Sequence, residues 1–321
     1  MWYIKETEET KEILGEKAQK FPLIFKKILY IIKNKLCIVN VKEIEDKIIC
    51  IIPFVKENKI TPKIAEKISN KINKLLDKNN VKNVVLSEHL NSIETLVNSL
   101  QANNINILDG RWLFKYEIID IVKYIAETSN KKVENLKISI LINDKHDVDE
   151  QNITLLANTV KSVNIVTNHI NEYKNLEERL QNDAGIIITI SNNTKKSLLK
   201  SDVIINIDFP EETINKYTLP KNVVLVNIEG KTNIQSKKFS GINVNFYNII
   251  LSENIIRNFI ENNLYNAFNS VVLYESIIFR KDNFKNIRED IQKDKVKIRN
   301  LIGNAGEINE EEFAYQFAQK S

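Results

Sequence analysis

The sequence predicts an α/β protein in which a small N-terminal α/β domain is followed by a domain built on a doubly wound parallel sheet, and then by C-terminal helices. The chain of 321 residues is 43% hydrophobic and 27% charged, which is typical of a folded protein with room for two cores. Strand-like apolar runs alternate with amphipathic helical segments up to about residue 125. Between residues 136 and 230, short runs of Ile and Val are almost continuously apolar, as parallel strands buried on both faces are. We expect the domains to cover residues 1–130, 136–250 and 251–321.

The N-terminal domain is expected to alternate strands with helices. Thr61 is placed to cap a helix that begins at Pro62, because proline is favoured at the first helical position. A second helix is expected over Ser92–Gln101. The apolar face of the first helix consists of Ile64, Ile68, Ile72, Leu75 and Leu76. The expected strands are LCIVNV (36–41), KIICIIPF (47–54), VKNVVLS (81–87) and Ile105–Leu108.

The two cysteines, Cys37 and Cys50, lie on consecutive strand-like runs and lack CxxC spacing. We interpret them as reduced core residues, and no zinc or other metal site is predicted.

The segment that leaves the first domain begins after Asp109 and Gly110. Its apolar residues, Leu113, Ile118, Ile121 and Ile125, recur at roughly helical spacing. The charged stretch NKKVEN (130–135) follows and is the expected linker.

The second domain is predicted to be a parallel sheet with helical crossovers. Helices are expected over Glu150–Val160 and Leu176–Gln181, whereas a shorter polar stretch, NNTKKSLLKS (192–201), fills the third gap. The expected strands are LKISILI (136–142), VNIVTNH (163–169), IIITISNN (186–193), DVIINIDF (202–209) and VVLVNIEG (223–230). Right-handed connections between these strands give a doubly wound sheet.

The C-terminal third is expected to be helical. One long packing helix is predicted over Glu253–Arg280, and a charged helix is predicted to run through Leu301 and stop at Gly303. Asn309 is placed to cap a last short helix that opens with three glutamates. The apolar positions of the long helix are Ile256, Phe259, Ile260, Leu264, Phe268, Val271, Val272, Ile278 and Phe279.

Charge and hydropathy limit the partners that we expect. The 46 basic and 42 acidic residues leave a net charge of only +4, and only six of the basic residues are arginine, so no nucleic-acid surface is expected. Lysines interrupt the most apolar N-terminal region, Phe21–Val41, which is therefore not expected to span a bilayer. The N-terminus lacks the order of a secretion signal, so we expect a cytoplasmic protein without a membrane partner.

Two segments of the second domain carry a family resemblance. The second expected strand ends in IVTNH, at Thr167–His169, and a later segment reads SDVIINIDFP, over Ser201–Pro210. Their order and spacing resemble the nucleotide-binding domain of the shikimate and quinate dehydrogenase and glutamyl-tRNA reductase group, over about a third of the chain. The resemblance implies a Rossmann-like, NAD(P)-binding type of domain.

A further likeness lies upstream, at Asp109 and Gly110 in NILDGRW. In shikimate dehydrogenases an aspartate at a comparable place takes part in proton transfer with a lysine from another segment. The corresponding stretch here, NVVLSEHLNS, offers Glu88 and His89 but no lysine at the matching position. The resemblance therefore implies Asp109 and His89 as catalytic candidates. The alternative for Asp109 and Gly110 is a plain turn between a strand and a helix.

The loop after the first strand of the second domain, in SILINDKHDVDEQN, departs from a phosphate-binding loop. It has no glycine, and between Asn143 and Glu150 four acids face a single lysine. A pyrophosphate there would meet like charges, each pair worth ~4 kcal/mol at 4 Å and an effective dielectric near 20. The acids are better suited to stabilise the start of the following helix.

What remains is the crevice at the carboxyl ends of the strands, where open α/β sheets tend to bind ligands. Its polar side chains suit a small polar ligand or a cation, although they also fit ordinary loops, and Thr167, Asn168 and His169 also suit a helix cap. The crevice candidates are Asn143, Asp144, Thr167, Asn168, His169, Asn192 and Asp208, together with Asn193 and Glu229.

Three hypotheses for function follow. The first is a non-catalytic binding or regulatory module with a degenerate nucleotide loop and no cofactor. The second is an NAD(P)-dependent oxidoreductase that uses Asp109 and His89. The third is an assembly protein whose C-terminal helices form a homodimer. No GxxxxGK[ST], HExxH or GxSxG motif occurs, so the common ATPase, zinc-protease and hydrolase classes have no local support.

Overall fold

The computed structural model forms two compact units. Unit 1 comprises Met1–Gly110 and Ser252–Arg280, and unit 2 comprises Arg111–Leu251 and Lys281–Ser321. The first unit thus ends earlier than residue 130, and the segment 251–321 is divided between the units instead of standing by itself. The structure describes residues 1–7, 12–13, 20–36, 39–53, 62–192, 196–234, 239–260, 264–279 and 283–318.

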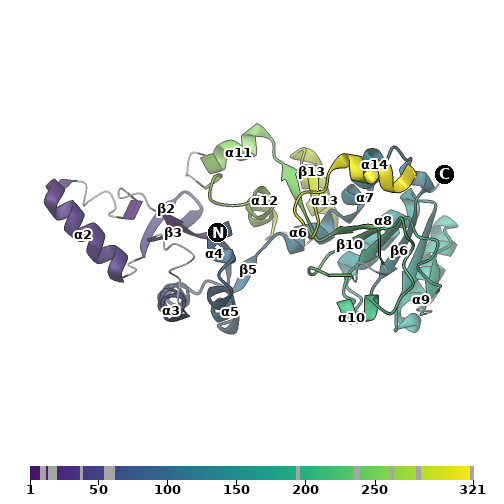
Figure 1. Ribbon diagram of the computed structural model, residues 1–321, viewed down its shortest axis with the longest axis horizontal. Coiled ribbons are helices and arrows are strands. Elements are labelled where there is room, and N and C mark those ends of the chain that lie inside the picture. Colours follow the sequence, from purple (N-terminus) through teal and green to yellow (C-terminus); the bar gives the residue numbers. More distant parts are fainter. Residues whose placement is uncertain are drawn as a thin grey trace. The chain divides into compact units, whose positions relative to one another are not determined.

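Unit 1 contains a five-stranded sheet that is parallel except for one edge strand (Figure 1). Across the sheet the strands are β2 (Asn40–Ile44), β3 (Lys47–Pro53), β1 (Trp2–Thr7), β4 (Asn83–Leu86) and β5 (Asn106–Leu108). The central strand β1 was not expected from the sequence, because Lys5 and Glu6 break its apolar run. Lys5 is nevertheless buried, and its Nζ donates to Glu12 at 2.9 Å.

Amphipathic helices complete unit 1. Helix α3 begins at Pro62 as expected and buries Ile68, Ile72 and Leu76 against the sheet, whereas its expected cap Thr61 lies outside the described residues. The helices are α2 (Leu23–Leu36), α3 (Pro62–Lys78), α4 (Glu88–Asn91), α5 (Glu94–Ala102), α11 (Glu253–Ile260) and α12 (Ser270–Ile278).

The prediction of one long helix over Glu253–Arg280 was wrong, since the structure has the two helices α11 and α12 there. Asn269 is the physical reason for the second start, because its side chain accepts the backbone N–H of Val271 at 2.8 Å and caps α12. Of the nine apolar positions, Ile260 is the exposed one, at 55%, and the other eight are buried or half-buried.

Unit 2 contains a six-stranded, wholly parallel sheet, as expected. Across the sheet the strands are β8 (Thr189–Ser191), β7 (Ser162–Val166), β6 (Lys137–Leu141), β9 (Val203–Asn206), β10 (Val224–Asn227) and β11 (Ile242–Val244). Numbered along the chain, this order is 3-2-1-4-5-6, the strand order of a doubly wound dinucleotide-binding fold. The fold class is therefore confirmed, and the sixth strand adds to the five expected.

Helices lead into this sheet and cross over between its strands. The crossover helices start earlier than expected, α8 at Asp147 and α9 at Ile170, and the polar stretch in the third gap forms turns between residues 196 and 200. The helices are α6 (Arg111–Tyr116), α7 (Ile118–Thr128), α8 (Asp147–Thr159), α9 (Ile170–Ala184) and α10 (Glu211–Ile214), and a short 3₁₀ helix covers Val133–Asn135 within the expected linker.

A second helix prediction, for the charged segment that runs through Leu301, was also partly wrong. The charged helix expected to run through Leu301 is α13 (Phe284–Lys293), and residues Lys297–Ile302 instead form strand β13, paired antiparallel with β12 (Phe246–Ile250). Lys295, two residues after the last residue of α13, has a φ of 55°, in the left-handed region, and this conformation prevents the helix from continuing.

The last helix, α14 (Glu310–Ala318), is confirmed, and the Asn309 side chain accepts the backbone N–H of Glu311 at 3.2 Å. Within the described part of the chain, none of the helices combines the length and the apolar character that crossing a bilayer requires.

Candidate functional site

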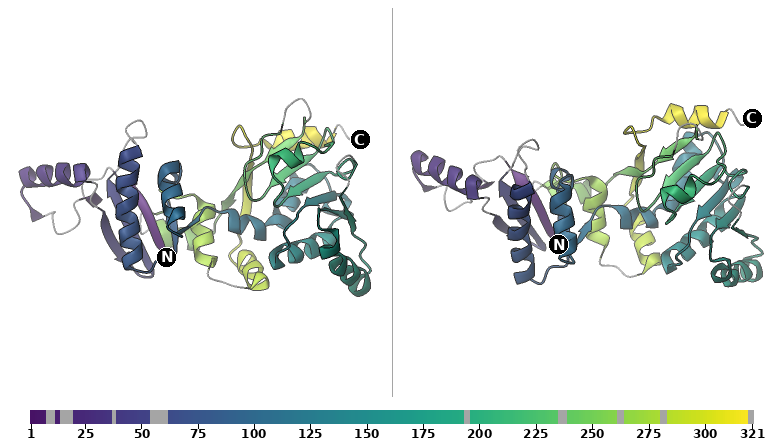
Figure 2. Two further views of the ribbon diagram at one scale, coloured as in Figure 1. Left: turned by 90° about the horizontal axis from the view of Figure 1, so that it is seen from below. Right: turned by 60° about the horizontal axis from the view of Figure 1, so that its bottom comes forward.

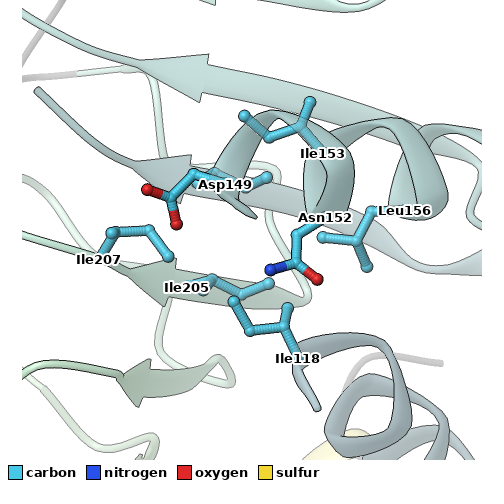
Figure 3. Close-up of a pocket in the computed structure, with 8 residues that line it drawn as sticks. Ile118, Asp149, Asn152, Ile153, Leu156, Ile205 and Ile207 are labelled. Carbon is cyan, nitrogen blue, oxygen red and sulfur yellow. The ribbon is translucent and has the colours of Figure 1, made fainter. Parts of the chain in front are cut away.

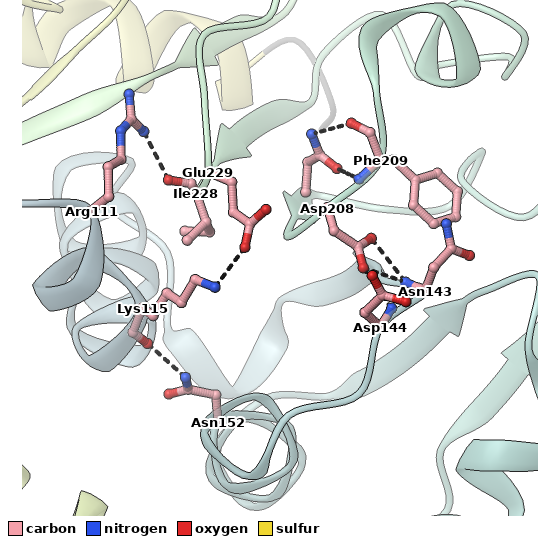
Figure 4. A network of polar contacts seen from close by, with 10 residues as sticks. Arg111, Lys115, Asn143, Asp144, Asn152, Asp208, Phe209, Ile228 and Glu229 are labelled. Carbon is pink, nitrogen blue, oxygen red and sulfur yellow. Dashed lines mark hydrogen bonds and ion pairs between the residues drawn. The ribbon is translucent and has the colours of Figure 1, made fainter. Parts of the chain in front are cut away.

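The carboxyl edge of the sheet in unit 2 gathers polar side chains from several strand ends (Figure 4). Asn143 and Asp144 follow β6, Asn168 follows β7, Asp208 follows β9 and Glu229 follows β10. Because all of these strands are parallel, their carboxyl ends meet at one edge, as the sequence predicted. We call this group the crevice site.

The Asp208 carboxylate accepts hydrogen bonds from the backbone of the loop after β6. Its two oxygens each accept the backbone N–H of Asn143 at 2.9 Å, and Oδ2 also accepts the backbone N–H of Asp144 at 2.7 Å. Backbone N–H groups in this loop are the donors that a dinucleotide fold offers to a phosphate. In this chain they are bound to an anion that the protein itself supplies.

The surroundings of Asp208 raise the pKa of its carboxyl above the ordinary value of 3.8. Partial burial raises the pKa of this carboxyl, and the neighbouring carboxylates of Asp144 and Glu229 raise it further, against the lowering effect of the two backbone hydrogen bonds. Acidic groups therefore dominate the field on this side of the loop, and a second anion would increase the repulsion.

The residues after β7 hold the turn into α9. Asn168 donates its backbone N–H to Asn143 Oδ1 at 3.0 Å, and His169 donates its backbone N–H to Thr167 Oγ1 at 3.0 Å. Thr167 is buried, while His169 is exposed with its Nδ1 3.6 Å from Glu172 Oε1. These contacts favour the structural interpretation of the segment, as a turn before a helix.

A pair of asparagines that the sequence interpretation missed shapes the strand ends. Asn206 Oδ1 accepts the backbone N–H of Phe209 at 2.9 Å, and this closes the turn that carries Asp208. Asn227, wholly buried, donates to Asn243 Oδ1 at 2.8 Å and to Asn245 Oδ1 at 3.0 Å. The sequence did contain a sign of this pair, because each of two apolar strands, β9 and β10, ends in an asparagine. The other edge candidate, Asn192, is exposed, and Asn193 lies outside the described residues.

Two basic residues of α6 also reach this edge of the sheet (Figure 4). Arg111 Nη1 donates to the backbone carbonyls of Asn227 and Ile228 at 3.1 and 2.9 Å. Lys115 Nζ lies 2.6 Å from Glu229 Oε1. Both cations therefore serve contacts within the protein, and the lysine charge is offset by the Glu229 carboxylate.

A buried acid, Asp149, lies in the first turn of α8 (Figure 3). Asp149 is 2% exposed, and among the described residues its two carboxylate oxygens have no hydrogen-bond partner. Asn152, one turn later, donates Nδ2 to the backbone carbonyl of Lys115 at 2.6 Å, while its Oδ1 is likewise unpartnered. The cavity beside them measures about 10 Å³, close to the smallest space that holds a water molecule. Its lining consists of Ile118, Ile140, Asp149, Asn152, Ile153, Leu156, Ile205 and Ile207.

Burial raises the pKa of Asp149 from 3.8 to about 6, because desolvation outweighs the attraction of Lys115 and His146. The carboxylates of Glu229 and Asp208 act in the same direction as burial. The crevice site and the buried acid are thus electrostatically linked.

The catalytic candidates Asp109 and His89 belong to unit 1, a different compact unit from the crevice site. Asp109 is exposed directly after β5, and Gly110 has a φ of 89°, where glycine is favoured. The backbone N–H of Gly110 donates to the buried Glu275 carboxylate at 2.7 Å. This is the geometry of a turn, and a catalytic role for Asp109 and His89 stays a prediction.

Cys50 belongs to unit 1 and does not lie in the crevice site. Cys50 is a free, buried thiol on β3, and burial raises its pKa to about 12. Cys37 lies outside the described residues. Within the described ranges no three His, Cys, Asp or Glu side chains gather as a metal site.

No family model matches the sequence, and no curated protein matches it. Solved structures are similar to this chain only at low sequence identity and low TM-score. The L-tryptophan dehydrogenase from Nostoc punctiforme is 9% identical over 99% of this chain and 87% of its own, with a TM-score of 0.31. The D-isomer specific 2-hydroxyacid dehydrogenase from Lactobacillus delbrueckii ssp. bulgaricus, in its NAD complex, is 11% identical over 92% and 96%, with a TM-score of 0.30.

A dipicolinate synthase chain from Bacillus halodurans is 12% identical over 56% of this chain and 59% of its own, with a TM-score of 0.32. Matches this weak carry no argument about function. The assignment of a Rossmann-like fold to unit 2 rests instead on its parallel sheet and the order of its six strands.

Proposed function

We propose that the protein is a non-catalytic binding or regulatory module on a Rossmann-like fold, and that it does not use NAD(P) as a cofactor. One observation carries this proposal. The Asp208 carboxylate accepts the backbone N–H groups of Asn143 and Asp144, in the loop where a redox coenzyme would place its pyrophosphate.

Repulsion between the Asp208 carboxylate and a pyrophosphate would weaken coenzyme binding substantially. A pyrophosphate at this loop either displaces Asp208 from two backbone donors or lies beside its charge. A unit like-charge pair at 4 Å is worth ~4 kcal/mol at an effective dielectric near 20. Each ~1.4 kcal/mol is a tenfold change in affinity, so this alone weakens binding about a thousandfold.

The same field favours a different ligand. The crevice site presents the carboxylates of Asp144, Asp208 and Glu229 together with the amide of Asn143, while the charge of Lys115 is offset by Glu229. A small polar ligand with a cationic group complements this arrangement, whereas a phosphate does not.

Calorimetry with NAD, NADP and their reduced forms tests the proposal. We expect no micromolar binding to the natural chain, and micromolar affinity for any of the four would overturn the proposal. Asp208→Ala removes the internal anion and is expected to increase coenzyme affinity by at least ~tenfold. Asp202→Ala is the matched control, because Asp202 also accepts a backbone N–H, that of Lys137 at 3.0 Å, but at the amino end of β6.

Coenzyme turnover separates this proposal from the oxidoreductase alternative. We expect no turnover with a panel of hydroxy acids and carbonyl compounds. Turnover that disappears in Asp109→Asn would overturn the non-catalytic assignment and support the role that the family resemblance implies. The third hypothesis, a homodimer through the C-terminal helices, is checked by light scattering of the natural chain.

A further inference from the structure

Helix α2 of unit 1 exposes large apolar side chains. Ile24, Ile28 and Ile32 recur every four residues and are 72%, 49% and 44% exposed. Leu23 and Phe25 at the start of the helix are 69% and 63% exposed. A contiguous apolar surface of this kind on a folded protein marks a place of interaction.

The orientation of α2 is the reverse of that of an ordinary surface helix. Lys33 faces the protein, where its Nζ donates to the backbone carbonyl of Ile13 at 2.9 Å and to Asn40 Oδ1 at 3.0 Å. Lys26, two turns earlier on the same side, is half-buried. In Figures 1 and 2 helix α2 extends away from the sheet of unit 1, and Lys33 connects it to Asn40 at the start of β2. Lys33 thus makes contacts within the protein, while Ile24, Ile28 and Ile32 are directed outward.

The charge around α2 has one sign. From Lys20 to Lys42 the sequence contains six lysines and no acid. Two copies of this helix placed face to face would bring like charges together, which argues against self-association through α2. An anionic surface is the complement of this segment.

We propose that α2 lies in the plane of an anionic lipid surface, with its apolar side inserted and the exposed Lys20 and Lys27 among the headgroups. Fourteen residues span about 21 Å as a helix, too short to cross a hydrocarbon core of ~30 Å. Interfacial helices combine an apolar face of Phe and Leu type with lysines on the polar face, and α2 has this composition.

The exposed arc of α2 favours lipid over a protein groove. Leu23, Ile24 and Phe25 are consecutive and all strongly exposed, so together they cover about 200° of the helix circumference at about 100° per residue. A protein groove encloses one stripe of a helix, whereas a fluid interface surrounds a wide arc. The sequence expectation of no membrane partner was argued from the lack of a spanning run, which an in-plane helix does not need.

Sedimentation of the full chain with vesicles tests this inference, which is independent of the crevice site. Vesicles of phosphatidylcholine alone are compared with vesicles that contain phosphatidylglycerol in equal parts. We expect at least ~tenfold stronger binding to the anionic vesicles, reduced when ~1 M salt shortens the screening length to ~3 Å. The double variant Ile24→Ser/Ile28→Ser is expected to lose at least ~tenfold in binding.

The matched control is the double variant Ile187→Ser/Ile260→Ser, which replaces two isoleucines that are 76% and 55% exposed outside α2. We expect it to bind vesicles like the natural chain, and circular dichroism checks that both double variants remain folded. Failure of the natural chain to bind anionic vesicles overturns the inference, as does equal binding to neutral vesicles. A dimer in light scattering that Ile24→Ser/Ile28→Ser abolishes, without lipid binding, would assign the face to a protein interface instead.

Discussion

The buried acid at the start of α8 makes a prediction about stability and pH. Asp149 has a folded-state pKa of about 6 against an ordinary value of 3.8. Between these two values the folded state holds a proton that the unfolded chain has released. The free energy of unfolding therefore falls as the pH rises through this window, and the loss is complete above the folded-state pKa.

The size of the effect follows from the shift. Each pKa unit is worth ~1.36 kcal/mol, so the rise from 3.8 to about 6 makes the ionised Asp149 cost ~3 kcal/mol. An acid in the first turn of a helix also contributes ~0.3–1 kcal/mol through the helix dipole. We therefore expect Asp149→Asn to stabilise unit 2 by ~2 kcal/mol at about pH 7 and to have little effect at about pH 4.

Urea unfolding followed by tryptophan fluorescence measures this difference. The chain has two tryptophans, Trp2 in unit 1 and Trp112 in unit 2, so a Trp2→Phe background reports on unit 2 alone. Asp147→Asn is the matched control, because Asp147 lies in the same first turn but is exposed. If Asp149→Asn and Asp147→Asn change the unfolding free energy equally at both pH values, the assignment of a buried ionised acid is refuted.

Three further predictions concern the interior of unit 2. Burial raises the pKa of Glu117 from 4.5 to about 8, so stability is expected to fall as the pH rises through that window, and urea unfolding of Glu117→Gln should remove this part of the dependence. Arg288 is 9% exposed and pairs with Asp120, so Arg288→Ala is expected to cost ~3 kcal/mol in urea unfolding, and a cost near zero would contradict the role of this pair. Ile165 on β7 is wholly buried, so Ile165→Ala is expected to cost ~2–5 kcal/mol by the same assay, and a value like that of an exposed site would contradict its place in the core.

The parallel sheet of unit 2 was predictable because its central strands β6, β9 and β10 are almost wholly buried and therefore appear in the sequence as apolar runs. The secondary-structure predictions failed where a polar residue is buried, and where apolar residues recur at helical spacing in a segment that is not a helix. Strand β1 carries Lys5 in its centre, and its charge is matched by Glu12, a partner that no local pattern predicts. Residues Lys297–Ile302 were predicted as helix, although pairing with β12 decides their conformation. Contacts distant in sequence thus override the local spacing.

The position of the crevice site could be predicted from the sequence, but its hydrogen-bond network could not. Parallel strands bring their carboxyl ends together, so Asn143, Asn168 and Asp208 had to be neighbours. The sequence pattern could not tell that Asp208 turns back on the loop after β6, because this depends on the Asn206 side chain closing the next turn. The charge of the loop was predicted from its own acids, whereas the decisive acid comes from 65 residues later in the chain.

The proposed function explains how the loop after β6 would keep its shape without a nucleotide. Its backbone donors need an acceptor, because unpaired N–H groups in a partly buried loop are costly. In a dinucleotide enzyme the glycines bring those donors close to a phosphate, whereas here Asp208 supplies the acceptor for the backbone N–H groups of Asn143 and Asp144. Under the proposed function glycine is not required in this loop, since no phosphate has to approach the backbone. Under the proposed function the missing glycines and the inward carboxylate are two consequences of one change, and Asp208→Ala alone, which restores the donors but not the close approach, is expected to recover only part of a coenzyme site.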